Sequence, residues 1–99
     1  MDFRWSDAVK NTYRQRIHEA QTAVNAALAA DGTSDTAALQ HEAQKLAGTA
    51  SLFGDIRVET AGYDLDQFLQ SHAASHADPE FVSFAERFRD ALNASRYIM

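Results

Sequence analysis

The sequence of 99 residues contains no cysteine, one proline and four glycines. The absence of cysteine excludes disulfides, thiolate metal ligands and a cysteine nucleophile. The scarcity of proline and glycine argues against long irregular stretches. No apolar run is long enough to span a bilayer, and residues 1–5 have no basic segment followed by an apolar one. We therefore expect no membrane span, no secretory signal and a cytoplasmic protein.

Positive charge is also scarce, since 9 Lys and Arg stand against 14 Asp and Glu and the net charge is −5. This balance argues against binding nucleic acid or an anionic membrane through overall charge. The length fits one domain over residues 1–99, and the 45% of hydrophobic residues are enough to fill one core. We expect a single soluble domain that is a monomer.

Four stretches have apolar residues at the three- and four-residue spacing of a helix face, and none alternates as a strand does. Helix stop and start signals separate them at 31–32, 54–55 and 78–80. Gly62 lies inside the third stretch, where a close approach by a neighbouring helix would explain it. The pattern predicts an all-α fold, an antiparallel up-down-up-down four-helix bundle. The predicted helices cover residues 6–30, 36–53, 56–72 and 79 onward.

The apolar positions of each stretch are expected to face a shared core. Their ordinary role is packing, and they do not point to a binding site. In chain order they are Val9, Tyr13, Ile17, Ala20, Val24 and Leu28, then Leu39, Ala43, Leu46, Ala50 and Phe53, then Val58, Ala61, Leu65, Phe68 or Leu69 and His72, and last Phe81, Phe84, Phe88, Ala91 or Leu92 and Ser95.

The second stretch carries another stripe beside its apolar face. Ala47, Gly48 and Ser51 stand three, four and seven residues after Gln44, so all four lie on one helix face. Three of the four are small, and a glycine inside an exposed helix is unfavourable unless something requires it. Such a stripe leaves the backbone approachable, so a partner could bring a reactive group close to position 44. Spacing alone leaves open a second explanation, that the stripe packs against another helix.

The stretch from Gln44 to Gly54 resembles the signature of the histidine-phosphotransfer domains of bacterial phosphorelays. In that signature a histidine is followed by a small residue at +4, a small residue at +7, a hydrophobic pair and a helix-ending glycine at +10. The four-helix plan of the family also covers nearly the whole chain. The positions that match the signature are Gly48, Ser51, Leu52, Phe53 and Gly54.

Two positions depart from the family pattern. Gln44 replaces the phospho-accepting histidine, and Ala47 replaces the lysine that many members carry at +3, although Lys45 stands beside the site. In the family, an imidazole nitrogen with a free lone pair takes the phosphoryl group from one aspartate or kinase histidine and passes it to another aspartate. The lone pair of a glutamine amide nitrogen is delocalised into its carbonyl, so this residue cannot accept the group.

The resemblance therefore implies a module that docks receiver domains of response regulators, or a sensor kinase, without carrying phosphate at position 44. It implies no independent enzyme, no catalytic residue, no cofactor and no metal. Whether Gln44 is natural or an engineered replacement of histidine stays open. The alternative function is an unrelated helical-bundle scaffold or assembly protein, in which the stripe is a packing seam. The expected partner-binding residues are His41, Gln44, Lys45, Ala47, Gly48 and Ser51.

The four histidines need to be considered as alternative phosphoryl acceptors or as metal ligands. His41 lies one turn before Gln44, but as the acceptor it would leave the small-residue stripe out of register, so we expect a solvated side chain. His18 has no comparable context and is expected on a polar face. His72 and His76 have the i, i+4 spacing of metal ligands on a helix, yet no third ligand is evident nearby, so we expect no metal site.

Overall fold

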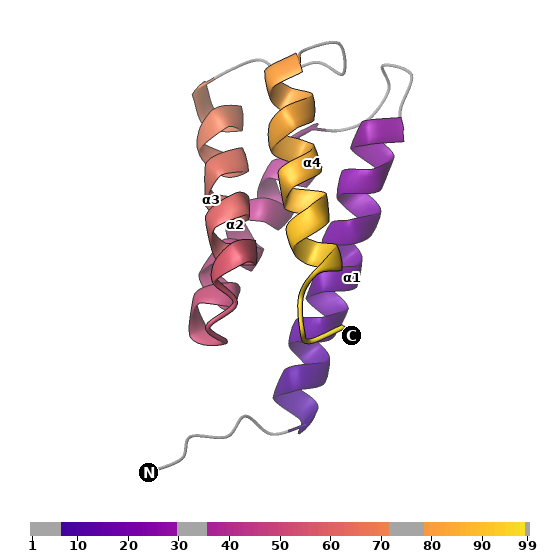
Figure 1. Cartoon of the computed structure of the whole chain (residues 1–99), viewed down its shortest axis with the longest axis vertical. Helices are drawn as coiled ribbons and strands as arrows, with labels where there is room; N and C mark the ends of the chain where they lie inside the picture. The colour runs from indigo at the N-terminus through magenta and orange to yellow at the C-terminus, as the bar shows by residue number, and fades with distance from the viewer. Residues whose placement is uncertain (1–6, 30–35, 72–78, 99) are drawn as a thin grey trace.

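The computed structural model describes residues 7–29, 36–71 and 79–98, and within them every regular element is an α-helix. The all-helical class predicted from the sequence is confirmed for this part of the chain. The predicted helix ends that fall on described positions agree to within one residue, except that the last helix ends at Asn93, before the predicted helical position Ser95. None of the described helices is both long and apolar enough to cross a membrane. The helices are α1 (Asp7–Ala29), α2 (Thr36–Leu52), α3 (Ile56–Ser71) and α4 (Pro79–Asn93) (Figure 1).

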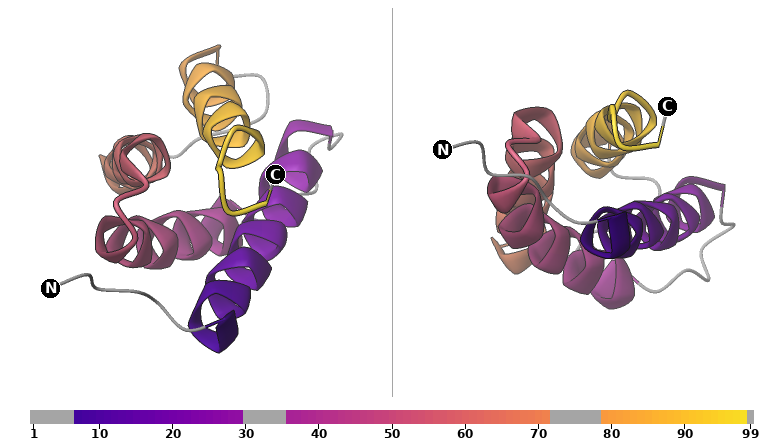
Figure 2. Two further views of the ribbon diagram at one scale, coloured as in Figure 1. Left: turned by 60° about the horizontal axis from the view of Figure 1, so that its bottom comes forward. Right: turned by 90° about the horizontal axis from the view of Figure 1, so that it is seen from below.

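Each helix packs against two others. α1 contacts α2 and α4, and α3 contacts the same two helices, whereas the diagonal pairs do not approach each other within the described residues. α1 begins at the bottom of Figure 1 and ends at the top, and α4 runs in the opposite direction. The two further views show the same four helices around one interior (Figure 2). One apolar face of every helix can therefore be buried in a common core.

The core contains most of the positions predicted from helical spacing. Val9 is a wrong prediction, because α1 extends past the other helices at its first turns and leaves this side chain 39% exposed (Figure 1). Leu28, Ala61 and Phe84 are only partly buried and pack against the edge of the core. The predicted core position His72 lies outside the described residues. The buried hydrophobic residues are Tyr13, Ile17, Ala20, Val24, Ala27, Leu39, Ala43, Leu46, Ala50, Phe53, Val58, Leu65, Phe68, Phe81, Ala85, Phe88, Ala91 and Leu92.

A tight turn connects α2 to α3 and fixes where α2 ends. The Asp55 N–H donates to the Ala50 carbonyl at 3.0 Å, and the Gly54 N–H donates to the Ser51 carbonyl at 3.3 Å. This pair of bonds is the Schellman arrangement, which satisfies carbonyls that the helix itself leaves unpaired. It requires a left-handed residue, and Gly54 has a φ of 67°. The helix-ending role predicted for Gly54 is confirmed.

Gly62 is buried where α3 comes close to α2. A methyl group added there would lie 3.0 Å from the Ala43 carbonyl oxygen and 3.3 Å from the Ala47 Cβ. Any side chain at this position would therefore push the two helices apart. The predicted reason for a glycine inside α3 is confirmed.

The segment after α4 folds back onto α1 and onto the turn between α2 and α3 (Figure 2). The rings of Tyr13 and Phe53 stack with centroids 4.3 Å apart, and the Tyr97 ring meets both edge-on. The Tyr13 hydroxyl donates to Asp55 Oδ2 at 2.8 Å, and the Ser95 hydroxyl donates to the same oxygen at 2.7 Å. The pKa of Tyr13 is raised, mainly because the hydroxyl is buried and secondly because it donates a hydrogen bond to Asp55. These contacts hold the C-terminal end against the helices.

Candidate functional site

The predicted stripe lies on the outer side of α2, opposite the core. Gln44, Gly48 and Ser51 are all exposed. A methyl group added at Gly48 would meet no atom within 4 Å. A glycine in a helix interior costs about 1 kcal/mol relative to alanine, and here no contact within the described chain requires it. Packing therefore does not explain the missing side chain at position 48.

The alternative explanation of the stripe was a seam between helices. It requires Gln44 and Gly48 to be buried, and both are exposed. Only Ala47, at the border with α3, lies in such a seam, because it is half-buried and its Cβ faces Gly62. The seam is therefore limited to one edge of the stripe, and the rest is open to solvent.

Lys45 lies at the other border of the stripe, toward α1. Its Nζ is 3.7 Å from the carboxylate of Glu42, one turn earlier on α2. This is a partly exposed ion pair, which contributes little to stability. The lysine side chain also closes one side of a polar hollow of about 330 Å³ between α1 and α2. The α1 residues that line this hollow are Thr12, Gln15, Arg16 and Glu19.

His41 and Leu52 extend the exposed surface along α2, from one turn before Gln44 to the last residue of the helix. His41 is exposed one turn before Gln44, and Leu52 is 65% exposed four residues after Gly48. Leu52 was not among the partner-binding residues expected from the sequence. Two features of the sequence could have identified it. Leu52 is apolar but does not belong to the core face of α2, and it stands four residues after Gly48, just as Gly48 stands four residues after Gln44. We call the exposed surface of His41, Gln44, Gly48, Ser51 and Leu52 the Gln44 face.

Two further large apolar side chains are exposed on α3, the helix that packs along α2. Ile56 is 70% exposed and Tyr63 is 57% exposed, and their spacing of seven residues puts them on one outer face. Neither residue belongs to the core face of α3, so the helical spacing alone could have predicted that both are exposed. Single exposed apolar side chains are common on protein surfaces, so these two do not by themselves mark a contact site.

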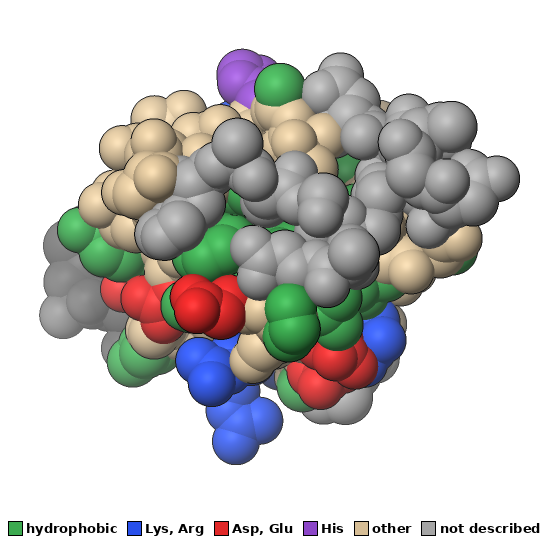
Figure 3. Space-filling view, turned by 90° about the horizontal axis from the view of Figure 1, so that it is seen from above, with side chains coloured by type: hydrophobic (Ala, Val, Ile, Leu, Met, Phe, Trp, Pro, Cys, Tyr) green, Lys and Arg blue, Asp and Glu red, His purple; other side chains and the backbone are tan. Residues whose placement is uncertain are grey.

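The surface is not uniform in charge. At the end of the molecule seen from above, hydrophobic side chains lie between two groups of acidic ones, and basic side chains gather along one edge (Figure 3). The Gln44 face itself contains no Asp, Glu, Lys or Arg, and the neighbouring Lys45 already pairs with Glu42. A partner on this face would be recognised through shape and neutral contacts more than through charge.

The chain matches no family model, no curated protein and no solved structure. The resemblance to histidine-phosphotransfer domains therefore depends on the spacing from Gln44 to Gly54 and on the helical plan.

The histidines add no second chemical centre among the described residues. His18 is exposed on α1, where its Nδ1 lies 3.0 Å from the Gln21 side-chain oxygen. His72 and His76, whose spacing suggested metal ligands, lie outside the described residues. Within the described part of the chain, no three His, Asp or Glu side chains are grouped closely enough to hold a metal ion. At the centre of the Gln44 face, the only functional group offered is the neutral amide of Gln44, which donates and accepts hydrogen bonds.

Proposed function

We propose that this chain is an interaction module of the histidine-phosphotransfer type in a two-component phosphorelay. It docks receiver domains of response regulators, or a sensor kinase, through the Gln44 face, and it does not carry phosphate at position 44. The observation that carries the proposal is Gly48, an exposed glycine with open space around it, one turn after Gln44. An absent side chain that the molecule itself does not need is best explained by a partner that approaches the backbone there.

The arrangement of the helices supports the same proposal. Each helix contacts its neighbours in the chain, α1 contacts α4, and these two run in opposite directions. An antiparallel up-down-up-down bundle of the histidine-phosphotransfer type has these contacts. In such a bundle position 44 lies on the outside of the second helix, within reach of another domain.

The chemistry of Gln44 limits what docking can achieve. Phosphoryl transfer between proteins depends mainly on positioning and on charge stabilisation. By resemblance, the receiver domain supplies the acidic pocket and Mg²⁺, and this chain supplies only the residue that enters the pocket. The Gln44 amide can enter as a hydrogen-bonding group, but it offers no nucleophilic electron pair. The module would therefore occupy a receiver without removing or delivering phosphate.

A receiver-binding titration tests the docking surface. Gly48→Arg places a long cation on the Gln44 face, and we expect it to weaken binding to a cognate receiver domain more than about tenfold, a loss of about 1.4 kcal/mol. Gly48→Ala should weaken binding by a smaller factor, because its methyl group protrudes less into the space that the partner occupies. Ala26→Arg, at an exposed position of α1, is the matched control for added charge. If Gly48→Arg binds like the parent chain with its helicity intact, the proposed surface is wrong.

A phosphoryl-transfer assay tests the role of position 44 separately. A receiver charged with labelled acetyl phosphate should transfer no label to the chain, whereas Gln44→His should become labelled because the imidazole restores a nucleophile. Label on the unmodified chain would contradict the claim that position 44 is inert. Failure of Gln44→His to accept label while still binding the receiver would contradict the assignment of position 44 as the acceptor position.

A further inference from the structure

A second feature lies away from the Gln44 face, where the C-terminal turn meets the first half of α1. A pocket of about 420 Å³ opens there and is lined by Lys10, Arg14, Arg96 and Tyr97. The chain has only 9 Lys and Arg residues in total, and its net charge is −5. Three of these cations therefore share one pocket, and no acidic residue of the described chain lines it. Such a concentration of positive charge in an acidic protein calls for an explanation.

Neutral oxygens hold both guanidinium groups in place. Arg14 Nε donates to the Tyr97 carbonyl at 2.7 Å, and Arg14 Nη1 donates to the Asn11 side-chain oxygen at 2.7 Å. Arg96 Nη2 donates to the Phe53 carbonyl and to the Tyr97 hydroxyl, each at 3.3 Å, and its guanidinium lies over the Tyr97 ring. These contacts fix the geometry of the two cations but do not neutralise them.

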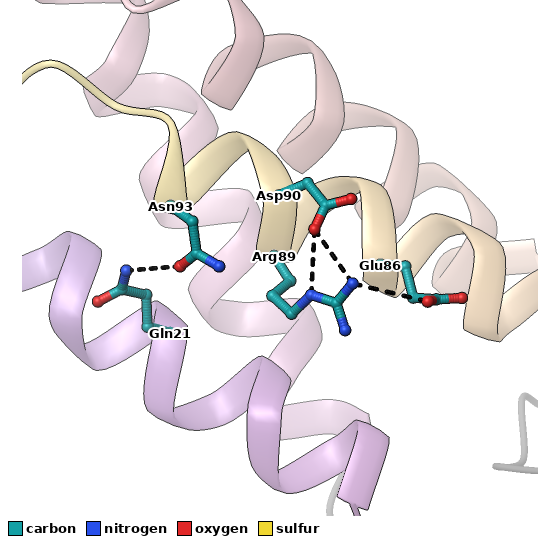
Figure 4. A network of polar contacts seen from close by, with 5 residues as sticks. All are labelled: Gln21, Glu86, Arg89, Asp90 and Asn93. Carbon is teal, nitrogen blue, oxygen red and sulfur yellow. Dashed lines mark hydrogen bonds and ion pairs between the residues drawn. The ribbon is translucent and has the colours of Figure 1, made fainter.

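Two cations elsewhere on the surface, Lys45 and Arg89, have carboxylate partners. Arg89 on α4 lies 3.1 Å from an oxygen of Asp90 and 3.6 Å from one of Glu86 (Figure 4). The same view shows the neutral contact between Gln21 of α1 and Asn93 of α4, at 2.9 Å. The three cations of the pocket thus differ from Arg89 in having no ion pair with a described residue.

Asp55 is a carboxylate that acts on Arg96 without lining the pocket. Asp55 Oδ2 accepts hydrogen bonds from the hydroxyls of Tyr13 and Ser95, and the Asp55 carboxylate attracts the Arg96 guanidinium electrostatically. The hydrogen bond to Tyr97 first, and the charge of Asp55 to a smaller degree, raise the pKa of Arg96, so the guanidinium stays a cation. This carboxylate already accepts hydrogen bonds from two hydroxyls and does not line the pocket.

We propose that the Lys10–Arg14–Arg96 pocket binds a small, doubly charged oxyanion of the phosphate class. The Lys10 ammonium donates no hydrogen bond to a described residue, and each guanidinium keeps N–H groups that its present contacts do not use. Several donors from α1 and from the segment after α4 suit a tetrahedral oxyanion, whose charge-assisted hydrogen bonds are among the strongest in proteins. Arginine forks are especially suited to phosphate. The site does not involve the Gln44 face and is independent of the proposed function.

Titration with inorganic phosphate, followed by backbone amide NMR at constant ionic strength, tests this site. We expect saturable shifts at the amides of residues 10–14 and 95–97. Phenyl phosphate in a parallel arm distinguishes a free ion from a phosphomonoester, because tighter binding of the ester would assign the pocket to an esterified phosphate. Acetate should bind more weakly, because it carries one charge. Shifts that do not saturate, or that chloride reproduces, would mean an adventitious ion only and would overturn the site.

Two charge-matched variants complete the test. Lys10→Gln should weaken phosphate binding about tenfold, the loss expected for one charge-assisted contact. It is expected to fold normally, because the lysine makes no ion pair or hydrogen bond with the described residues. Arg89→Gln changes the net charge equally at a cation that already has carboxylate partners, and it should bind phosphate like the parent chain. Equal weakening in both variants would show a general charge effect and would overturn the proposal.

Discussion

Gly48 of α2 and Gly62 of α3 both lie inside a helix, yet their surroundings are opposite. A methyl group at Gly62 would come within 3.0 Å of a backbone oxygen of the neighbouring helix, whereas one at Gly48 would meet nothing within 4 Å. The first glycine is there because two helices need to approach each other. The second has no such reason inside the described molecule. A glycine that costs helix stability without improving packing is the observation on which the proposed docking surface depends.

The same contrast holds for the two faces of α2, and truncating one leucine on each face would show it most strongly. Leu46 is fully buried in the core, so Leu46→Ala should lower the free energy of unfolding by about 2–5 kcal/mol. Leu52 is 65% exposed, and Leu52→Ala should change it by no more than about 0.5 kcal/mol. Urea denaturation of both variants gives the two values. Similar losses would mean that the Gln44 face is covered by the rest of the chain.

Gly62→Ala is the next most informative change. Alanine gains about 1 kcal/mol in helix propensity, but overpacking of a tight contact costs about 1–3 kcal/mol. The nearest atom, the Ala43 carbonyl oxygen, belongs to the backbone and cannot swing aside as a side chain can. We therefore expect a net loss of about 1 kcal/mol, measured by thermal and urea unfolding. A variant more stable than the parent would show that α2 and α3 separate easily.

Gly48→Ala should have the opposite sign. The added methyl group meets no neighbour, and the unfolded chain loses conformational freedom, so stability should rise by about 0.5–1 kcal/mol. The same unfolding measurements apply, and Gly62→Ala is the matched control because the chemical change is identical. A loss of stability at position 48 would mean that a part of the chain outside the described residues covers this glycine.

Sequence reasoning works here where an interaction is local or periodic. The core faces of the helices follow from apolar spacing, and the end of α2 at Gly54 follows from the need for a left-handed residue. Spacing cannot tell where neighbouring helices stop, which is why Val9 was wrongly assigned to the core. It also does not separate Gly48 from Gly62, because the difference between them lies in the distance to another helix.

Features built from distant parts of the chain escape sequence reasoning altogether. The Tyr13–Asp55 hydrogen bond joins residues 42 positions apart, and the Arg14–Tyr97 bond joins residues 83 positions apart. None of these side chains belongs to a local sequence pattern, so the sequence does not predict that they are in contact. The pocket of Lys10, Arg14 and Arg96 exists because the segment after α4 returns to α1, a contact that no local pattern predicts.

Gln44→His should have the smallest effect on the fold and the largest on the chemistry. Gln44 is exposed, and histidine is only slightly poorer than glutamine as a helix former, so the free energy of unfolding should change by no more than about 0.5 kcal/mol. Unfolding curves that nearly overlay those of the parent would make any new phosphoryl acceptance a property of the imidazole alone. A large loss of stability would instead assign Gln44 a packing role. That result would remove the distinction between an inner and an outer face of α2 on which the proposed docking surface depends.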